Sequence, residues 1–216
     1  MTVLSVNVNK IALLRNSRGR NHPNLVAFVE QLLALGVKGI TVHPRPDERH
    51  ISRQDVYDIS HYLNDFPEVE FNIEGYPVAA FLDLVIEVGP AQCTLVPDQP
   101  GQLTSDHGWD VAANQDLLVD VLNRLREAGI RSSLFVDPSP LVVTQVRTVG
   151  ADRVELYTED YASRRCRSAG RPADQGPAGT PGKRRAGAVR PAGSRATGDH
   201  GAGRGRVCRG QPRAGL

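Results

Sequence analysis

A unit made of a helix, a glycine and a strand recurs in the apolar and polar pattern of this chain. Four times before residue 162, an amphipathic segment ends at a glycine and a short β-rich run follows within a few residues. Glycine just past a helix end adopts the left-handed conformation at no steric cost, so these glycines predict helix ends. They are Gly36, Gly89, Gly129 and Gly150.

The segments between these glycines predict the elements. Apolar residues recur at helical spacing over 25–33, 56–63 and 117–125. Ser52 and Asp55 have the spacing of a capping box, and Asn114 could open the third of these helices. The intervening runs are largely apolar instead of alternating, which is typical of parallel strands buried on both faces. Strands are expected at about 3–7, 38–42, 70–74, 91–96, 131–136 and 152–157, with a helical pattern after each of the first five.

Alternating strands and helices predict a parallel sheet, either a closed barrel or an open doubly wound sheet. The first expected strand is followed by neither GxGxxG nor GxxxxGK[ST], so the nucleotide-binding forms of the open sheet lose support. The sequence therefore favours an α/β fold of the TIM (β/α)8 barrel type, with about six of its eight βα units in residues 1–162.

Polar side chains stand at the end of nearly every expected strand. In such a barrel the reacting groups lie at the carboxyl ends of the strands. Taken singly, each of these residues could be a turn residue or a solvated charge. Many polar side chains that gather at the same ends of the strands are hard to explain by packing alone. The candidates are Asn7, Asn9, Lys10, His43, Arg45, Glu74, Thr104 and Glu155.

Two of these candidates suit proton transfer, and others suit an anion. An unperturbed His43 would titrate near neutrality, as a general acid or base does. Glu74 places a carboxylate in an apolar strand, which is costly without a partner. Lys10, Arg18 and Arg45 together would suit phosphate oxygens. His61 on an outer helix and His107 in a loop are expected at the surface.

Charge divides the chain in two. The formal net charge is +2, but residues 163–216 hold 13 of the 26 Lys and Arg and only two of the 24 acidic residues. This segment is rich in Arg, Gly, Ala and Pro and has no aromatic residue, so it cannot bury enough apolar surface to offset its ordering entropy. We expect a barrel domain over 1–162 and a disordered tail over 163–216.

Other classes of protein find little support. The chain has no long uncharged apolar stretch and no signal-peptide pattern, so we expect a cytoplasmic protein without a membrane partner. Its three cysteines have no metal-ligand or CxxC spacing, which predicts no metal site and no disulfide framework.

Several ordered segments resemble one family, the pyridoxine 5′-phosphate synthases of vitamin B6 biosynthesis. They are VNVNKIALLRNSRG, GITVHPRPDERHI, NIE, LVPDQPGQLTSDHGWDV and VELYTEDYA, between about residues 3 and 162. The resemblance implies a (βα)8 barrel that condenses 1-deoxy-D-xylulose 5-phosphate with 3-amino-2-oxopropyl phosphate and releases phosphate and water. It also implies that no metal or organic cofactor is used, and that the chain forms a homo-oligomer, commonly an octamer.

The resemblance assigns roles to individual residues. His43 and Glu74 match the acid/base residues, and Glu155 matches a further carboxylate of the site. Asn7 and Arg18 match residues that hold the aminoketone phosphate. The deoxyxylulose phosphate side is matched by Asn9, Lys10, Arg45, His50 and Thr104. Many family members have Asp-His where this chain has Asn9-Lys10, a variation in which Lys10 can still reach a phosphate or hydroxyl.

The basic tail raises a separate question. It begins where the family would continue with roughly two more βα units, which carry a Gly-His with the general acid and a second Gly-His that binds phosphate. Asp199-His200-Gly201 echoes them only superficially, because no strand-forming residues precede it. An abrupt change to residues with GC-rich codons suggests a frameshift, and we expect this copy to be poorly stable and inactive.

Two alternatives remain open. One is another phosphate-substrate barrel enzyme, such as an isomerase or an aldolase. The other is a nucleic-acid-binding protein acting through the basic tail, which would bind in a strongly salt-dependent manner. The second is disfavoured because a real extension would follow a completed domain.

Overall fold

The computed structural model describes residues 2–98, 102, 105–159 and 161–162. The chain divides into two compact units, Met1–Thr158 and Glu159–Leu216. The expectations for residues 163–216, including disorder, lie outside the described residues. All of the architecture below belongs to the first unit.

Strands and helices alternate along this unit. The elements are β1 (Ser5–Asn7), α1 (Asn9–Asn16), α2 (Leu25–Ala34), β2 (Gly39–Val42), α3 (Arg53–Leu63), β3 (Glu70–Gly75), α4 (Ala79–Val88), β4 (Gln92–Leu95), α5 (Gln115–Glu127), β5 (Arg131–Val136), α6 (Pro140–Val149) and β6 (Arg153–Leu156). The strands coincide closely with those expected from the sequence.

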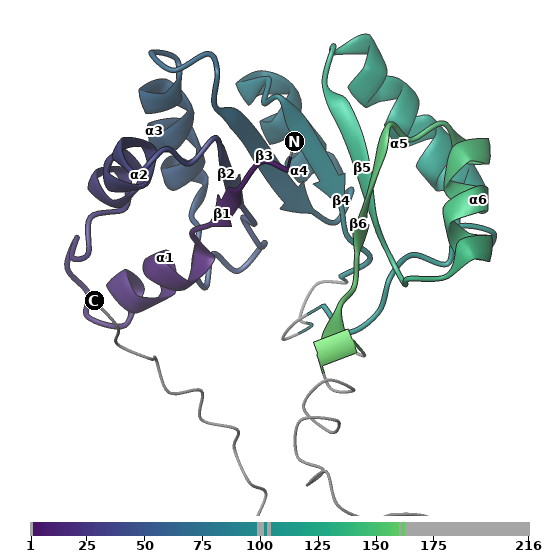
Figure 1. Cartoon of the computed structure of the whole chain (residues 1–216), viewed down its shortest axis with the longest axis horizontal. Helices are drawn as coiled ribbons and strands as arrows, with labels where there is room; N and C mark the ends of the chain where they lie inside the picture. The colour runs from purple at the N-terminus through teal and green to yellow at the C-terminus, as the bar shows by residue number, and fades with distance from the viewer. Residues whose placement is uncertain (1, 99–101, 103–104, 160, 163–216) are drawn as a thin grey trace, which may run out of the picture. The chain divides into compact units, whose positions relative to one another are not determined.

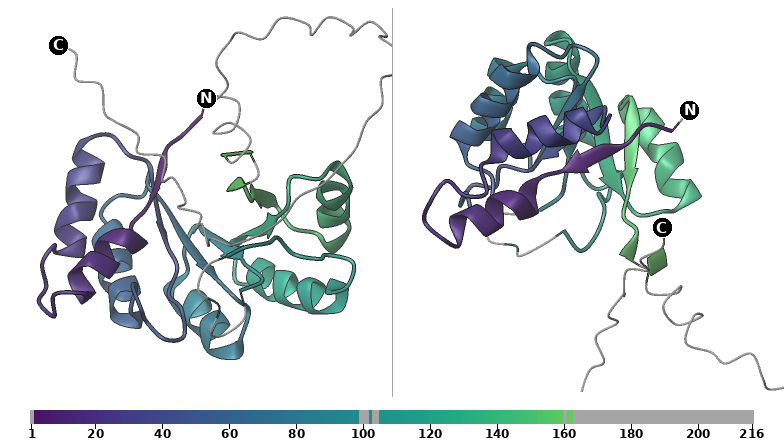
Figure 2. Two further views of the ribbon diagram at one scale, coloured as in Figure 1. Left: turned by 90° about the horizontal axis from the view of Figure 1, so that it is seen from below. Right: turned by 60° about the vertical axis from the view of Figure 1, so that its left-hand side comes forward.

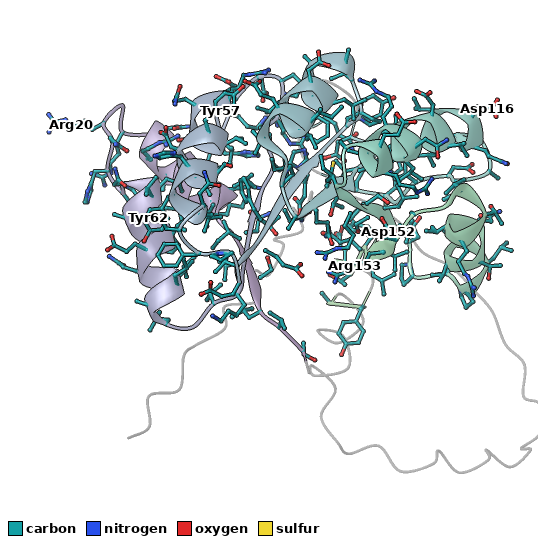
Figure 3. All side chains as sticks on the ribbon, turned by 90° about the horizontal axis from the view of Figure 1, so that it is seen from above. Arg20, Tyr57, Tyr62, Asp116, Asp152 and Arg153 are labelled. Carbon is teal, nitrogen blue, oxygen red and sulfur yellow. The ribbon has the colours of Figure 1, made fainter. Side chains whose placement is uncertain are left out.

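The strands form a single curved sheet in their chain order, β1 to β6. Every neighbouring pair is parallel, and Figures 1 and 2 show the helices outside the curve of this sheet. This arrangement is that of a (β/α)8 barrel opened between its first and sixth strands, so the predicted fold class is confirmed. Within the described residues, β1 and β6 are the edges of the sheet.

Helix boundaries follow the expected signals. Gly36, Gly89, Gly129 and Gly150 all have positive φ at or next to a helix end. The Ser52 side chain accepts from the backbone of Asp55 and the Asp55 side chain accepts from the backbone of Ser52, which completes the expected capping box of α3. These local signals set where the chain leaves each helix for the next strand.

The expected burial of the strands on both faces is confirmed for β2 to β5, apart from the first residues of β3, β4 and β5, but apolar and polar side chains alternate along them. Apolar side chains such as Ile40, Val42 and Ile73 pack in the core beneath the helices. Between them stand polar side chains that hydrogen-bond across the inner face of the sheet. Ser5 pairs with Thr41 (3.0 Å), Asn72 with Thr41 (3.4 Å) and Thr94 with Asn72 (3.1 Å). The inner face is therefore polar, and only the outer face is a hydrophobic core.

Helix α1 was missing from the sequence prediction, which placed a loop between β1 and the helix over 25–33. The Asn7 side chain accepts a hydrogen bond from the Asn9 backbone N–H at 3.0 Å just before the helix. Among α1 residues, only Ala12 is buried, so the segment lacks a strong apolar stripe. Lys10 consequently lies in the first turn of a helix.

Candidate active site

Strands β2 and β3 bring an imidazole and a carboxyl group together. His43 directly follows β2 and Glu74 lies near the end of β3, and both are buried. The His43 Nδ1 and Glu74 Oε2 atoms are 3.9 Å apart, which is too long for a hydrogen bond. Asn7 at the end of β1 donates through Nδ2 to Glu74 Oε2 at 3.5 Å.

Burial and nearby charge shift both groups toward their neutral forms. Burial, followed by the charges of Arg45, His50 and Arg49, lowers the pKa of His43 to about 3. Burial, followed by the charges of Glu155 and Asp98, raises the pKa of Glu74 well above its usual range. The site therefore holds a neutral imidazole, which its lowered pKa makes less basic than an unperturbed histidine, next to a carboxyl group that keeps its proton.

A second carboxyl group reaches the same inner space from the opposite edge of the sheet. Glu155 on β6 lines a cavity of about 610 Å³ together with Asn7 and Glu74. Burial raises the pKa of Glu155. The three predicted residues on β1, β3 and β6 therefore face one polar cavity, although they are far apart in the sequence.

The residues after β1 support the loop that follows β2. The Asn9 side-chain oxygen accepts from the His43 backbone N–H at 2.9 Å, which fixes the end of β2 against α1. Lys10 is exposed, and its charge is one of the causes that lower the pKa of His50, after burial and the charges of Arg45 and Arg49. The rings of His43 and His50 lie 6.1 Å apart. Asn9, Lys10, His43 and His50 thus belong to one neighbourhood.

A second cavity, of about 490 Å³, opens beside His43. Three arginines line it: Arg45, Arg49 and Arg53. Arg45 is buried and forms an ion pair with Asp98, and its Nη1 donates to the Gln102 carbonyl at 2.7 Å. Guanidinium groups at this density suit an anionic ligand such as a phosphate ester.

An ion pair on the outer side secures the same loop. Arg15 on α1 contacts both carboxylate oxygens of Asp55, at 2.5 Å and 2.8 Å. The next residue, Asn16, donates to the carbonyls of Arg49 and His50 at 3.2 Å and 2.8 Å. Helix α1 therefore clamps the β2–α3 loop that carries the cations.

Two predicted residues are not joined to this cluster. Arg18 lies on the exposed turn after α1, and in the described part of the chain no hydrogen bond or ion pair connects its side chain to the other candidates. Thr104 lies outside the described residues. His61 and His107 are exposed, as expected.

Sequence reasoning found Asp55 as a helix-capping residue but missed its ion pair with Arg15, and it also missed Asp98 and Tyr76. Asp98 stands three residues after β4, where a strand-end search could have found it. Tyr76 follows β3 and its ring stacks on Trp109, with centroids 5.8 Å apart. The clamp is a tertiary pairing between two helices and has no local signal.

The described residues hold no group of three or more His, Cys, Asp or Glu side chains that could bind a metal ion. None of the helices in the described ranges combines the length and the apolar character needed to cross a bilayer. The described site residues supply imidazole, carboxyl, amide, ammonium and guanidinium groups.

The fold and the site define a class, the (βα)-barrel enzymes with acid/base groups at the carboxyl ends of parallel strands. Residues 4–178 match the family described as pyridoxal phosphate biosynthesis protein PdxJ. The chain belongs to this family.

Curated relatives agree with that assignment. The chain is 56% identical over 163 residues to a pyridoxine 5′-phosphate synthase of Bacteroides thetaiotaomicron, and 55% identical to one of Bacteroides fragilis. Each match covers 76% of this chain and 67% of the relative. About a third of each relative thus has no counterpart in the matched region.

Among solved structures, an HMG-CoA lyase from Brucella melitensis is similar, with a TM-score of 0.50 and 13% identity. The match covers 71% of this chain and 60% of that one. At this identity the likeness concerns the fold alone.

Proposed function

We propose that the described site is that of a pyridoxine 5′-phosphate synthase, condensing 1-deoxy-D-xylulose 5-phosphate with 3-amino-2-oxopropyl phosphate. The observation that carries the proposal is the buried His43–Glu74 pair beside a cavity lined by arginines. Ring closure between an amine and a ketose phosphate forms an imine, expels water and phosphate and moves several protons. Such a sequence needs more than one acid/base group and cationic sites for two phosphate esters.

Each residue has a part in this scheme. His43 in its neutral form accepts protons, and Glu74 in its protonated form supplies them, with Glu155 as a further carboxyl group of the inner cavity. Asn7 and Arg18 hold the aminoketone phosphate. The deoxyxylulose phosphate is held by Asn9, Lys10, Arg45, His50 and Thr104.

The protein further acts, in this proposal, in the cytoplasm and as a homo-oligomer. It requires no metal or organic cofactor. Sedimentation of the purified chain tests the assembly, and a single species of monomer mass would contradict it.

We also propose that residues 163–216 do not replace the last βα units of the barrel and derive from a shifted reading frame. Their composition cannot supply apolar strands, and about a third of each matched relative lies outside the aligned region. Translating the gene downstream of codon 162 in the other two frames is the test. Recovery of two Gly-His loops supports the proposal, and their absence from both frames would refute it.

Activity is best tested on a chimera that closes the sheet. Residues 1–162 are joined to the last third of the Bacteroides thetaiotaomicron synthase, and formation of pyridoxine 5′-phosphate is measured. We expect turnover that falls by roughly 100-fold or more in His43→Asn and in Glu74→Gln, the range typical of a lost acid/base group. Exposed His61→Asn is the matched control. A chimera that folds but forms no product, or loses nothing in the two variants, would reject the proposed function.

A further inference from the structure

Asp98 is a buried carboxylate to which the proposed function gives no role. It follows β4, lines the cavity that also contains His43 and Arg45, and is 4% exposed. Its Oδ1 atom is buried and has no hydrogen-bond partner in the described part of the chain. A buried acceptor without a donor is costly, so it calls for an explanation.

The other carboxylate oxygen is fully used. Asp98 Oδ2 forms the ion pair with Arg45 Nη2 and accepts from Ser105 Oγ at 2.6 Å. Arg45 in turn donates through Nη1 to the Gln102 carbonyl. The guanidinium is thus oriented by two partners from the β4–α5 segment, while Oδ1 takes no part.

A second ion pair in the same unit shows what a purely structural contact looks like. Arg15 and Asp55 form a bidentate ion pair, in which Nη1 donates to Oδ1 and Nη2 donates to Oδ2. That geometry satisfies both oxygens and is the usual strong form of an Arg–carboxylate contact. The Arg45–Asp98 pair uses one oxygen only, although it is at least as buried.

The backbone around Asp98 is held in place. The Val96 N–H donates to the Gly75 carbonyl at 3.0 Å, and the Trp109 indole N–H donates to the Leu95 carbonyl at 2.9 Å. A Cβ added at Gly108 would lie 2.2 Å from the Asp137 backbone nitrogen, so this loop packs tightly against the end of β5. The backbone that leads from β4 into Asp98 is therefore fixed by its neighbours.

We infer that Asp98 is a substrate-binding residue: Oδ1 accepts a hydrogen bond from a hydroxyl of the sugar phosphate, while Oδ2 orients Arg45 toward its phosphate group. The inference rests on the proposed function, because it places the ketose phosphate in the cavity of Arg45. It assigns to one side chain the recognition of a polyol chain and the alignment of the cation.

Two probes separate these roles. The affinity for inorganic phosphate depends on the cationic group of Arg45 alone. The affinity for 1-deoxy-D-xylulose 5-phosphate depends both on Arg45 and on the oxygen of Asp98 that accepts from a hydroxyl group. Binding to the full-length protein is followed by fluorescence of Trp109, the chain's single tryptophan, whose ring stacks on Tyr76 in the wall of the cavity. Calorimetry gives an independent dissociation constant.

Asp98→Asn is expected to weaken binding of the sugar phosphate by roughly 10- to 100-fold, the effect of losing a hydrogen bond to a charged group. Binding of inorganic phosphate should stay unchanged or become tighter, because Arg45 loses the anion that neutralises it. The ratio of the two dissociation constants therefore rises in the variant. Asp47→Asn is the matched control, since Asp47 lines the same cavity and pairs with Arg49 but is exposed.

Three results would overturn the inference. Equal weakening of both probes in Asp98→Asn would mean that Asp98 only maintains the loop. An unchanged ratio with both affinities retained would mean that Oδ1 contacts no substrate. The same change of ratio in Asp47→Asn would mean that any lost negative charge suffices. Failure of the unsubstituted protein to bind the sugar phosphate would instead contradict the proposed function, and the inference with it.

Discussion

The central strands and the edge strands of the sheet differ sharply. All residues of β2 are buried, and β3, β4 and β5 are buried except at their first residues. In β1 and β6 no residue is buried, and Val154 and Leu156 are 37% and 45% exposed. His43 and Glu74 belong to the centre, whereas Asn7 and Glu155 stand on the edges. The acid/base pair is therefore placed by a packed core, and its two polar neighbours lie on strands that have a strand neighbour on one side only within the described part of the chain.

The largest effect is expected from one matched pair of leucines. Leu134 on β5 is 0% exposed and Leu156 on β6 is 45% exposed. Leu134→Ala should lower the free energy of unfolding by about 2–5 kcal/mol, because it leaves a cavity in the core. Leu156→Ala should cost less than about 1 kcal/mol. Denaturant unfolding measures both, and equal losses would show that the edge is as well packed as the centre.

The clamp on the β2–α3 loop should matter nearly as much. Arg15→Gln leaves the buried Asp55 carboxylate without its bidentate partner, and we expect a loss of about 2–4 kcal/mol. Arg53→Gln removes an exposed pair with Glu87 and should cost less than about 1 kcal/mol. If the two substitutions were equivalent in chemical denaturation, the clamp would be no more than a surface contact.

Glu74→Gln should stabilise the fold, although it removes the carboxyl group that is proposed to supply protons. The raised pKa of Glu74 means that its ionised form is disfavoured in the folded state. Its contribution to stability is therefore present at low pH and is lost as pH rises through the folded pKa. We expect the variant to gain about 1 kcal/mol or more at pH 8 and less at pH 5. If the variant lost stability at pH 8, the conclusion that burial disfavours the ionised form of Glu74 would be contradicted.

The smallest expected effect concerns the protonation of the His43 ring. With its pKa lowered to about 3, the ring should stay neutral between pH 5 and 8 in NMR spectra of the free protein. Because the folded pKa is lowered, His43 contributes stability above the unfolded value of about 6.5 that is lost as pH falls toward 3. Bound phosphate offsets the charges of Arg45 and Arg49 and should raise this pKa. Titration near 6.5 without phosphate would rule out the desolvated site.

The sequence predicted the fold well because its signals are local. The glycines at the helix ends, the capping box of Ser52 and Asp55, and the strand runs each act within a few residues. The polar inner face was missed, because Thr41, Asn72 and Thr94 satisfy one another across three strands that are distant in sequence. Helix α1 was missed because its apolar face is small.

The candidate site divides in the same way. His43, Arg45, Glu74 and Glu155 were found because they stand at strand ends, and parallel strands end at one edge. Asp98 also stands just after a strand and was overlooked, whereas the Arg15–Asp55 clamp depends on a contact between two helices that no spacing in the sequence encodes. The raised pKa of Glu74 likewise depends on burial and on Glu155, which lies on β6, three strands later in the sheet.

The central claim is that the packed strands hold the acid/base pair, together with the proposal that residues 163–216 do not supply the last βα units of the barrel. The most direct test is the rate of pyridoxine 5′-phosphate formation by the 216-residue chain, measured beside the chimera that supplies the last third of the relative. We predict turnover for the chimera and at least about 100-fold less for the chain itself. Equal turnover would contradict the claim, because it would show that the chain completes its site without those units.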